Sequence, residues 1–312
     1  MSRIHRGTKV PNAGNIGWVP FKTDMFGRTK VSEPFTIFDS AHRYQDNNDY
    51  SDEVVGTAST TYSLHESTVY LNVGTAQGDK LTRETRRVFP YQPGKSLQVM
   101  QTFSFGTPKT GVRYRAGYFS RTNGVFLERS GTSNYLVLRS FSSGQLVENR
   151  IPQVDWNIDP LDGTGPTDLV LDLSKVQILV SEYEWLGVGS VRVGFIINGV
   201  FVGAHQFNHA NLIESVYMTT ATLPIRYEIE NLTATGSASS MKQICSTVIS
   251  NGGYLKITET WNATVDTKNV TGNYTPLIAI RMASGRTDSV IVPAEISIFP
   301  TSNDDFEWAL IK

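Results

Sequence analysis

The sequence predicts an all-β fold, an antiparallel β-sandwich of the jelly-roll type with an extended N-terminal arm. About fifteen short segments rich in Val, Tyr, Phe, Leu and Thr alternate apolar and polar residues, with Gly, Asn and Ser turns between them. No segment of the roughly 10–12 residues that a helix needs has a helical period. Because so many strands exceed what one twisted open sheet carries, we expect two packed antiparallel sheets.

The N-terminal segment, residues 1–60, differs from the rest of the chain. It contains Pro, Gly and isolated aromatic residues without a sustained period of 2 or 3.6. Aromatic side chains are costly to leave in water, so we interpret the segment as an arm that docks on its own domain or on a neighbouring subunit. The side chains expected to make these partner contacts are Trp18, Phe21, Phe26, Phe35 and Phe38.

Residues 61–312 are expected to form the sandwich body, and the Pro/Gly/Asp-rich loop at 150–168 is the best candidate for a subdivision within it. Each expected strand is a short run of β-branched and aromatic residues bounded by turn residues. The expected strands are 68–73, 96–105, 112–121, 134–141, 169–174, 176–184, 190–197, 200–205, 215–222, 225–232, 244–250, 254–261, 276–283 and 289–299.

The clearest local signal is a β-hairpin over residues 190–205. Alternate residues from Val191 to Ile197 are apolar on one face. Asn198-Gly199 then supplies the two residues with positive φ that a type I′ turn needs, and residues 200–202 return antiparallel. The segment therefore predicts two paired strands with a tight turn.

Two acids upstream of this hairpin, Glu182 and Glu184, fall on one face of an expected strand. Such a pair could serve as general acid and nucleophile of a sandwich-fold glycoside hydrolase or lyase. Neighbours at i and i+2 are roughly 6.5–7 Å apart along a strand, a spacing equally typical of the solvated side of a half-buried sheet. We adopt this second interpretation. Since nucleophile-elbow and phosphate-loop motifs are also absent from the sequence, we predict a protein that is not an enzyme and has no catalytic or cofactor-binding residue.

Two segments raise the question of a metal site. His205 and His209 have the i, i+4 spacing that joins two ligands on a helix, but in an extended chain this spacing separates them by about 13 Å. The loop at 159–168 carries Asp159, Asp162 and Asp168 among glycines, as a calcium loop would. These glycines and aspartates also form ordinary turns. We predict no metal or cofactor, with calcium at the 159–168 loop as the alternative.

Composition limits the partners. The chain has 28 Lys and Arg against 29 Asp and Glu, a net charge of −1, so we expect no nucleic-acid partner. Its single cysteine, Cys245, excludes a disulfide within the chain and is expected to face the core. No apolar run approaches the roughly 18 residues of a membrane span, and no signal peptide is recognisable. We therefore expect no membrane partner and a cytoplasmic site of synthesis.

Two blocks resemble known proteins. TDMFGRTKVSEPFTIFDS (23–40) and the block from WNIDPLDGTGPTD to SSMKQICSTVISNGG (156–253) resemble virion structural proteins of tailed bacteriophages, notably those of marine and cyanobacterial hosts. The residue pattern of the second block also resembles that of concanavalin-like jelly-roll domains. This resemblance implies a capsid decoration or other particle-surface protein, located in the virion after assembly in the host cytoplasm. It further implies other virion subunits as partners, such as major capsid or tail proteins, together with copies of the same chain.

An alternative within the same resemblance is a tail or baseplate fibre or spike protein. Its jelly roll would bind a host-surface carbohydrate, since such folds bind sugars through exposed aromatic side chains. The hydrolase or lyase discussed above is a further alternative. The side chains available for stacking on a glycan are Trp156, Tyr183 and Trp185.

Overall fold

The computed structural model of this chain describes residues 33–255, 263–265, 268–269, 275–281 and 296–299. Two compact units divide the chain, residues 1–260 and 261–312. The boundary between units therefore falls near residue 260, and the expected subdivision at the 150–168 loop is wrong. All the strands described below belong to the first unit, and no helix among the described residues is long and apolar enough to cross a membrane.

One sheet has eight strands in the order β13-β12-β11-β6-β15-β4-β3, with β1 also paired to β15. The 13-residue strand β15 pairs with β6 along one edge, and along the other edge it pairs first with β4 and then with β1. The strands are β1 (Pro34–Ala41), β3 (Ser59–Ser63), β4 (Thr68–Val73), β6 (Ser96–Ser104), β11 (Gln177–Tyr183), β12 (Val191–Ile197), β13 (Val200–Phe207) and β15 (Ser239–Asn251).

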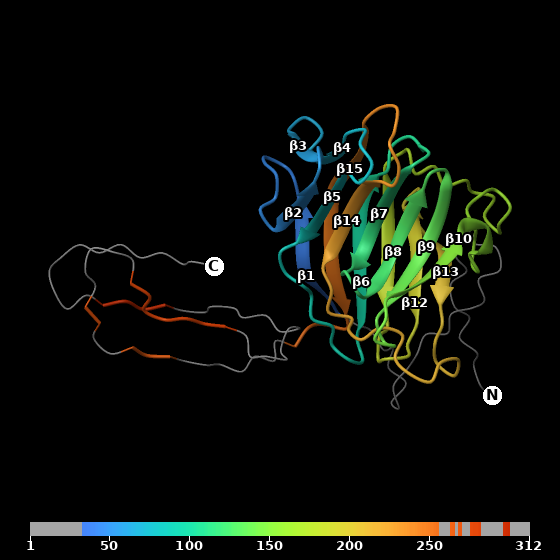
Figure 1. Ribbon diagram of the computed structural model, residues 1–312. Coiled ribbons are helices and arrows are strands. Elements are labelled where there is room, and N and C mark those ends of the chain that lie inside the picture. Colours follow the sequence, from blue (N-terminus) through green and yellow to red (C-terminus); the bar gives the residue numbers. More distant parts are fainter. Residues whose placement is uncertain (1–32, 256–262, 266–267, 270–274, 282–295, 300–312) are drawn as a thin grey trace, which may run out of the picture. The chain divides into compact units, whose positions relative to one another are not determined.

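The other sheet has seven strands in the order β10-β9-β8-β7-β14-β5-β2, and it faces the viewer in Figure 1. Every strand pair in both sheets is antiparallel. The strands are β2 (Tyr50–Val55), β5 (Lys80–Thr85), β7 (Val112–Phe119), β8 (Gly124–Ser130), β9 (Ser133–Ser140), β10 (Val147–Pro152) and β14 (Ile225–Asn231), and the short 3-10 helix η1 (Gln153–Asp155) follows β10. The predicted all-β antiparallel sandwich of the jelly-roll type is confirmed.

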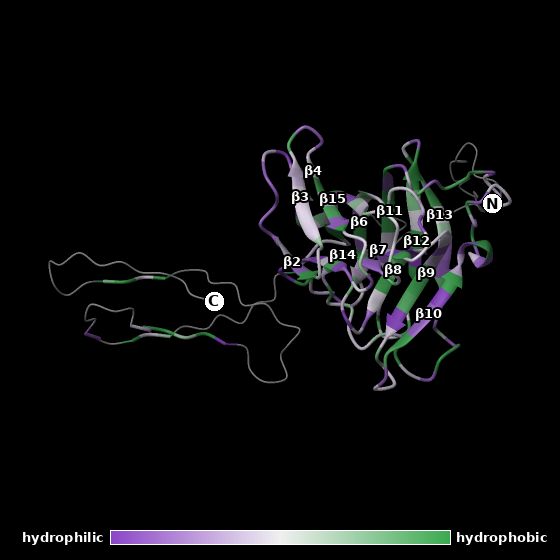
Figure 2. Ribbon diagram, turned by 45° about the horizontal axis from the view of Figure 1, so that its top comes forward, coloured by the Kyte–Doolittle hydropathy of each residue, from purple (hydrophilic) through white to green (hydrophobic). Residues whose placement is uncertain are grey.

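The core lies between the two sheets and follows from period-2 alternation. Along β7, Tyr114, Ala116 and Tyr118 point inward and are at most 1% exposed. Along β4 of the opposite sheet, Val69 and Leu71 are fully buried in the same core. Figure 2 shows hydrophobic residues along β9 and more polar ones along its neighbour β10 at the sheet edge. Each fully buried large apolar side chain contributes roughly 1.5–3 kcal/mol to folding.

The predicted boundary of the arm at residue 60 is wrong, because residues 34–63 supply strands β1, β2 and β3. Phe38 of β1 is 1% exposed and packs on Phe89, with ring centroids 5.0 Å apart, so it belongs to the core rather than to a partner contact. Phe35 is partly exposed and stacks on Tyr254 of the same chain. The remaining expected contact residues, Trp18, Phe21 and Phe26, lie outside the described residues.

The hairpin prediction is confirmed, since β12 and β13 pair across Asn198 and Gly199, whose φ angles are 52° and 77°. The predicted strands at 169–174 and 215–222 are wrong: both segments run as irregular loops, apart from one isolated bridge at Val170. Within the expected body, strands β5, β8 and β10 were not predicted. β5 contains Arg83, which looks like a surface residue in the sequence but is 1% exposed and donates to Asp52 and Gln243.

Candidate ligand-binding groove

A groove of about 760 Å³ lies between the edges of the two sheets of the described sandwich. β10 ends one sheet and β13 ends the other, and both contribute to its walls. Ligand sites of small molecules usually have volumes of about 300–1,000 Å³. We call this hollow the edge groove; it is lined by Leu138, Ser142, Asn149, Ile151, Asn157, His205, Gln206, Phe207, Asn208, His209, Leu212, Ile213, Glu214, Ser215, Val216 and Tyr217.

A β-bulge in β13 aims His205 at the edge groove. The register of β12 against β13 shifts between Val193 and Gly194, which leaves Ala204 as the extra residue of β13. Ala204 and His205 are consequently both buried although they are neighbours in a strand. Bulges commonly redirect a side chain in this way, and without the bulge alternate residues would point to opposite faces.

The side chain of Asn157 closes the free edge of β13 beside this bulge. Its amide donates to the carbonyl of Gln206 at 2.9 Å and accepts from the N–H of Gln206 at 2.8 Å, so it takes the place of one residue of a further strand. The backbone N–H groups of Ile158 and Asp159 both donate to the carbonyl of Ala204. An exposed strand edge can pair with other chains. Residues 157–159 instead form hydrogen bonds with the backbone at this edge of β13.

The imidazole of His205 is held neutral by burial, which lowers its pKa to about 4. Its Nδ1 accepts the backbone N–H of Asn157 at 3.1 Å. A neutral imidazole carries one proton, so the proton of His205 is on Nε2.

The second imidazole of the edge groove belongs to His209, which follows β13. Its Nδ1 lies 2.6 Å from the carbonyl oxygen of Gly189, and its ring stacks on Tyr217. Burial lowers the pKa of His209, although the contact with the Gly189 carbonyl raises it in part. A glycine is required at 189, because a Cβ there would lie 1.7 Å from the carbonyl oxygen of Glu184. The turn at 184–190 therefore positions the Gly189 carbonyl that orients the His209 ring.

The lining of the edge groove is polar but nearly uncharged. Four side-chain amides enter it, and Glu214 is the one Asp, Glu, Lys or Arg that lines it among the described residues. Leu212 is 71% exposed and, with Ile213, adds an apolar wall. Side-chain amides and hydroxyls both donate and accept hydrogen bonds, so this lining suits a neutral ligand rich in hydroxyl groups.

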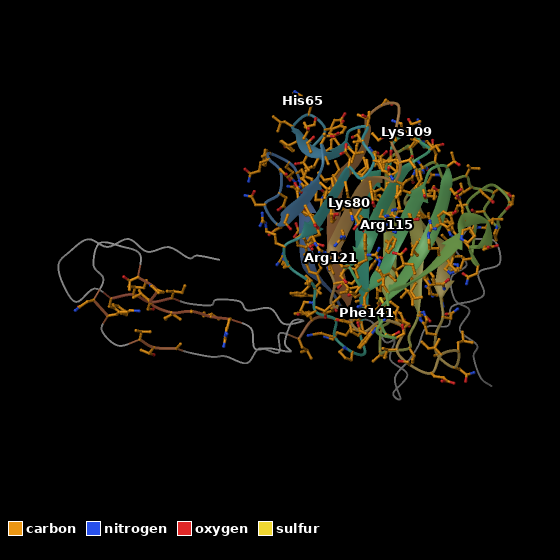
Figure 3. The ribbon with its side chains drawn as sticks, in the orientation of Figure 1. His65, Lys80, Lys109, Arg115, Arg121 and Phe141 are labelled. Carbon is orange, nitrogen blue, oxygen red and sulfur yellow. The ribbon has the colours of Figure 1, made fainter. Side chains whose placement is uncertain are left out.

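A second candidate is the outer face of the seven-stranded sheet, which carries several ion pairs around Arg115, labelled in Figure 3. In the strand register Arg115 of β7 lies opposite Glu128 of β8 and Glu228 of β14. The resulting ion pairs measure 2.7 Å and 3.3 Å. We call this set the charged face; it comprises Arg115, Glu128, Arg139, Glu148, Arg150, Arg226 and Glu228 around the buried rings of Phe119 and Phe126.

The carboxylates of the charged face are committed to arginines. Burial alone would raise the pKa of Glu228, but Arg226, Lys80 and Arg115 bring it down to about 2. Arg115 and Arg139 likewise lower the pKa of Glu148 against the effect of its burial. A general acid needs a carboxyl group that stays protonated near neutral pH. These two carboxylates have the opposite property, and the strand register makes the charged face a layer of cross-strand ion pairs.

The aromatic residues expected to stack on a glycan do not line the edge groove. Tyr183 is fully buried and Trp156 is 4% exposed, so for these two residues the prediction is wrong: inward strand positions and loop packing place them in the core. Trp185 is half-buried, and its indole N–H donates to the carbonyl of Met218. The acids considered for catalysis are also separate from the groove. Glu182 accepts a hydrogen bond from Ser96 across the sheet, and Glu184 is exposed in the following turn.

Hydrogen bonds within the 159–168 loop engage the carboxylates of Asp159 and Asp162. Asp159 accepts the N–H of Leu161 and both the N–H and the hydroxyl of Thr167. Asp162 accepts in the same way from Thr164. Among the described residues no group of three or more His, Cys, Asp or Glu side chains has the arrangement of a metal site.

Comparison with known proteins yields structural likenesses at low sequence identity. No protein-family model matches the chain, and no curated protein matches it. A protein of unknown function from Shewanella oneidensis MR-1 is 12% identical over 73% of this chain and 91% of its own, with a TM-score of 0.46. The CBM2 module of the evolved Dit of Lactobacillus casei BL23 phage J-1 is 8% identical over 72% of this chain and 100% of its own, with a TM-score of 0.45. Bacillus licheniformis β-glucanase is 10% identical over 71% and 99%, with a TM-score of 0.43.

Sequence reasoning missed most of the edge groove. It singled out His205 and His209 by their spacing, but as candidate metal ligands. Nothing in the sequence marks Asn157 or Gly189, whose roles depend on chain segments that meet only in the folded sandwich.

Proposed function

We propose that this chain is a non-enzymatic, saccharide-binding component of a bacteriophage particle, and that its ligand is a neutral carbohydrate held in the edge groove. The observation that carries the proposal is the lining of this groove. It combines side-chain amides, hydroxyls and two neutral imidazoles with an apolar wall at Leu212 and Ile213, and Glu214 is its one charged side chain among the described residues. Sugars present hydroxyl groups and apolar ring faces together, and such a lining matches both.

The same lining argues against charged ligands. Phosphate and nucleic acid are recognised by Arg and Lys, and among the described residues none of either type lines the edge groove. Arg192 is the basic residue whose side chain reaches a groove residue, and it donates to the amide oxygen of Gln206.

A catalytic role is not part of the proposal. A glycoside hydrolase needs one carboxylic acid and one carboxylate flanking the scissile bond. The edge groove offers only Glu214 among its described lining residues, and the carboxylates of the charged face are paired with arginines. Binding without turnover is therefore the simpler proposal.

The virion part of the proposal is supported by the sequence resemblance of residues 23–40 and 156–253 to structural proteins of tailed phages. A saccharide-binding sandwich would act there in adhesion to the host surface, as part of a tail or baseplate fibre or spike. The first expectation from the sequence, a capsid decoration held by subunit contacts, differs from this in copy number, since a head lattice takes far more copies than a tail. Quantitative mass spectrometry of purified particles of the encoding phage separates the two.

The binding proposal is tested on a glycan array that carries neutral, sialylated and sulfated oligosaccharides, probed with the full chain. We expect a small set of neutral glycans to bind. Binding confined to anionic glycans, or to none on an array that includes host-surface polysaccharide, contradicts the proposal.

A further inference from the structure

We propose that His205 and His209 supply one hydrogen-bond donor and one acceptor to the edge groove, locked in opposite tautomers by the backbone, and that they select ligands that offer both an acceptor and a donor. This inference rests on the proposed function and specifies its chemistry: the recognised group is a sugar hydroxyl. Both imidazoles line the groove.

The tautomer of His205 is fixed by a donor that cannot change. The N–H of Asn157 points at Nδ1 of His205 at 3.1 Å, and a backbone N–H never accepts. Nδ1 therefore keeps its lone pair and Nε2 carries the hydrogen. Asn157 cannot drift away, because its side chain is tied twice to the backbone of Gln206. His205 thus presents an N–H donor.

The tautomer of His209 is fixed by an acceptor. The carbonyl oxygen of Gly189 lies 2.6 Å from Nδ1, so Nδ1 must carry the hydrogen, and in the neutral ring Nε2 keeps its lone pair. Tyr217 stacks flat on the ring and holds its plane. His209 thus presents an acceptor.

Both Nε2 atoms are free for a ligand. No hydrogen bond within the described part of the chain uses either of them. Nε2 of His42, in contrast, is enclosed without a partner, and neither groove nitrogen is among the enclosed, unpartnered atoms. Among the described residues, the other titratable groups that line the groove are Glu214 and Tyr217, and burial raises the pKa of the Tyr217 phenol.

A donor and a fixed lone pair in one groove discriminate between ligand classes. A phosphate or carboxylate satisfies His205 but meets the lone pair of His209 with lone pairs of its own. An ammonium group satisfies His209 but meets the N–H of His205. Hydroxyl groups both accept and donate, so separate hydroxyls of one saccharide can accept from His205 and donate to His209.

Asparagine substitutions test the pair, because an asparagine amide retains the Nδ1 function and lacks the Nε2 atom. His205→Asn keeps an acceptor for the Asn157 N–H, and His209→Asn keeps a donor for the Gly189 carbonyl. His65→Asn is the matched control, since His65 is exposed in the β3–β4 turn. It lies far from Phe141, which follows β9 and precedes groove residue Ser142 (Figure 3).

The measurement is titration calorimetry of the full chain with the neutral oligosaccharide that binds best on the array. We expect each groove variant to bind about three- to tenfold more weakly and His65→Asn to bind as the wild type does. Long-range ¹H–¹⁵N NMR of the free protein reports the tautomers directly, with Nε2–H expected for His205 and Nδ1–H for His209.

The outcomes separate the two proposals. Wild-type affinity in both groove variants, or the reverse tautomer at either histidine, overturns the pair and leaves saccharide binding standing. If the wild-type chain binds no neutral glycan, the proposed function fails, and the histidine pair fails with it. If the groove variants no longer fold, as judged by their NMR spectra, the tautomers of the wild-type protein still decide the inference.

Discussion

The imidazole of His209 lies flat against the phenol ring of Tyr217, with ring centroids 3.9 Å apart and an interplanar angle of 4°. Tyr217 is 4% exposed, and its hydroxyl has no hydrogen-bond partner within the described part of the chain. The ring therefore stabilises the fold through stacking and packing, whereas burial of its unpaired hydroxyl destabilises it. This relationship fixes one wall of the edge groove.

Replacement of Tyr217 separates these two effects. Tyr217→Phe removes the unpaired hydroxyl and keeps the stacked ring, so we expect unchanged or higher stability, by up to roughly 1 kcal/mol. Tyr217→Leu removes the ring as well and should cost about 2–4 kcal/mol from lost packing and stacking. Urea unfolding of both variants measures the difference. A Phe variant less stable than the Leu variant would refute this assignment.

Asn157 should protect the edge of β13. Asn157→Ala deletes two hydrogen bonds to the backbone of Gln206, and we expect a loss of about 1–3 kcal/mol. The amide hydrogen of Gln206 should then exchange faster with solvent, which hydrogen-exchange mass spectrometry detects. Asn149→Ala is the control, because Asn149 is exposed in β10 and lines the same groove. Equal exchange at Gln206 in both variants would mean that Asn157 does not close the edge.

The charged face predicts a strong contrast between two arginines. Arg115→Met leaves Glu128, which is fully buried, short of a partner, and we expect a loss of about 3–5 kcal/mol. Arg121→Met breaks an exposed pair with Glu53 and should cost at most about 1 kcal/mol. Both arginines are labelled in Figure 3. Thermal unfolding of the two variants compares them, and similar losses would show that the charged face is not a buried network.

Stability should fall as the pH falls from about 6.5 to about 4, in part because of His205. Its pKa is about 4 in the folded chain and near 6.5 when unfolded, so over this window the unfolded chain binds more protons. His42 and His209, whose pKa values burial also lowers, act in the same direction. His205→Asn should reduce the loss of unfolding free energy between these two pH values by roughly 1–3 kcal/mol. Chemical denaturation across this pH range measures it, and a wild-type slope in the variant would contradict the buried, neutral histidine.

The fold was predictable from the sequence where alternation is strict and turns are explicit. The hairpin around Asn198 and Gly199 is the clearest case, because two residues with positive φ leave few alternatives. β1 was not predictable in this way. Only Phe38 and Ser40 among its residues are fully buried, and its remaining positions resemble a loop in composition.

The candidate site was less predictable, for a physical reason. Arg83 and Arg115 look solvated because their partners, Asp52 and Glu228, are supplied by strands distant in sequence. The tautomers of His205 and His209 depend on single backbone atoms of Asn157 and Gly189. Sequence spacing cannot show such contacts, whereas it does show which residues alternate.

The most direct test of the central claim is a blocking experiment on the edge groove. Ser215 is exposed and lines the groove, so Ser215→Trp introduces a large side chain into it without replacing a buried residue. Ser59→Trp places the same side chain on β3, at the opposite end of the eight-stranded sheet from β13. Titration of both variants with the best neutral glycan should show binding abolished in the first and intact in the second. Full binding by Ser215→Trp would place the saccharide elsewhere and contradict the account.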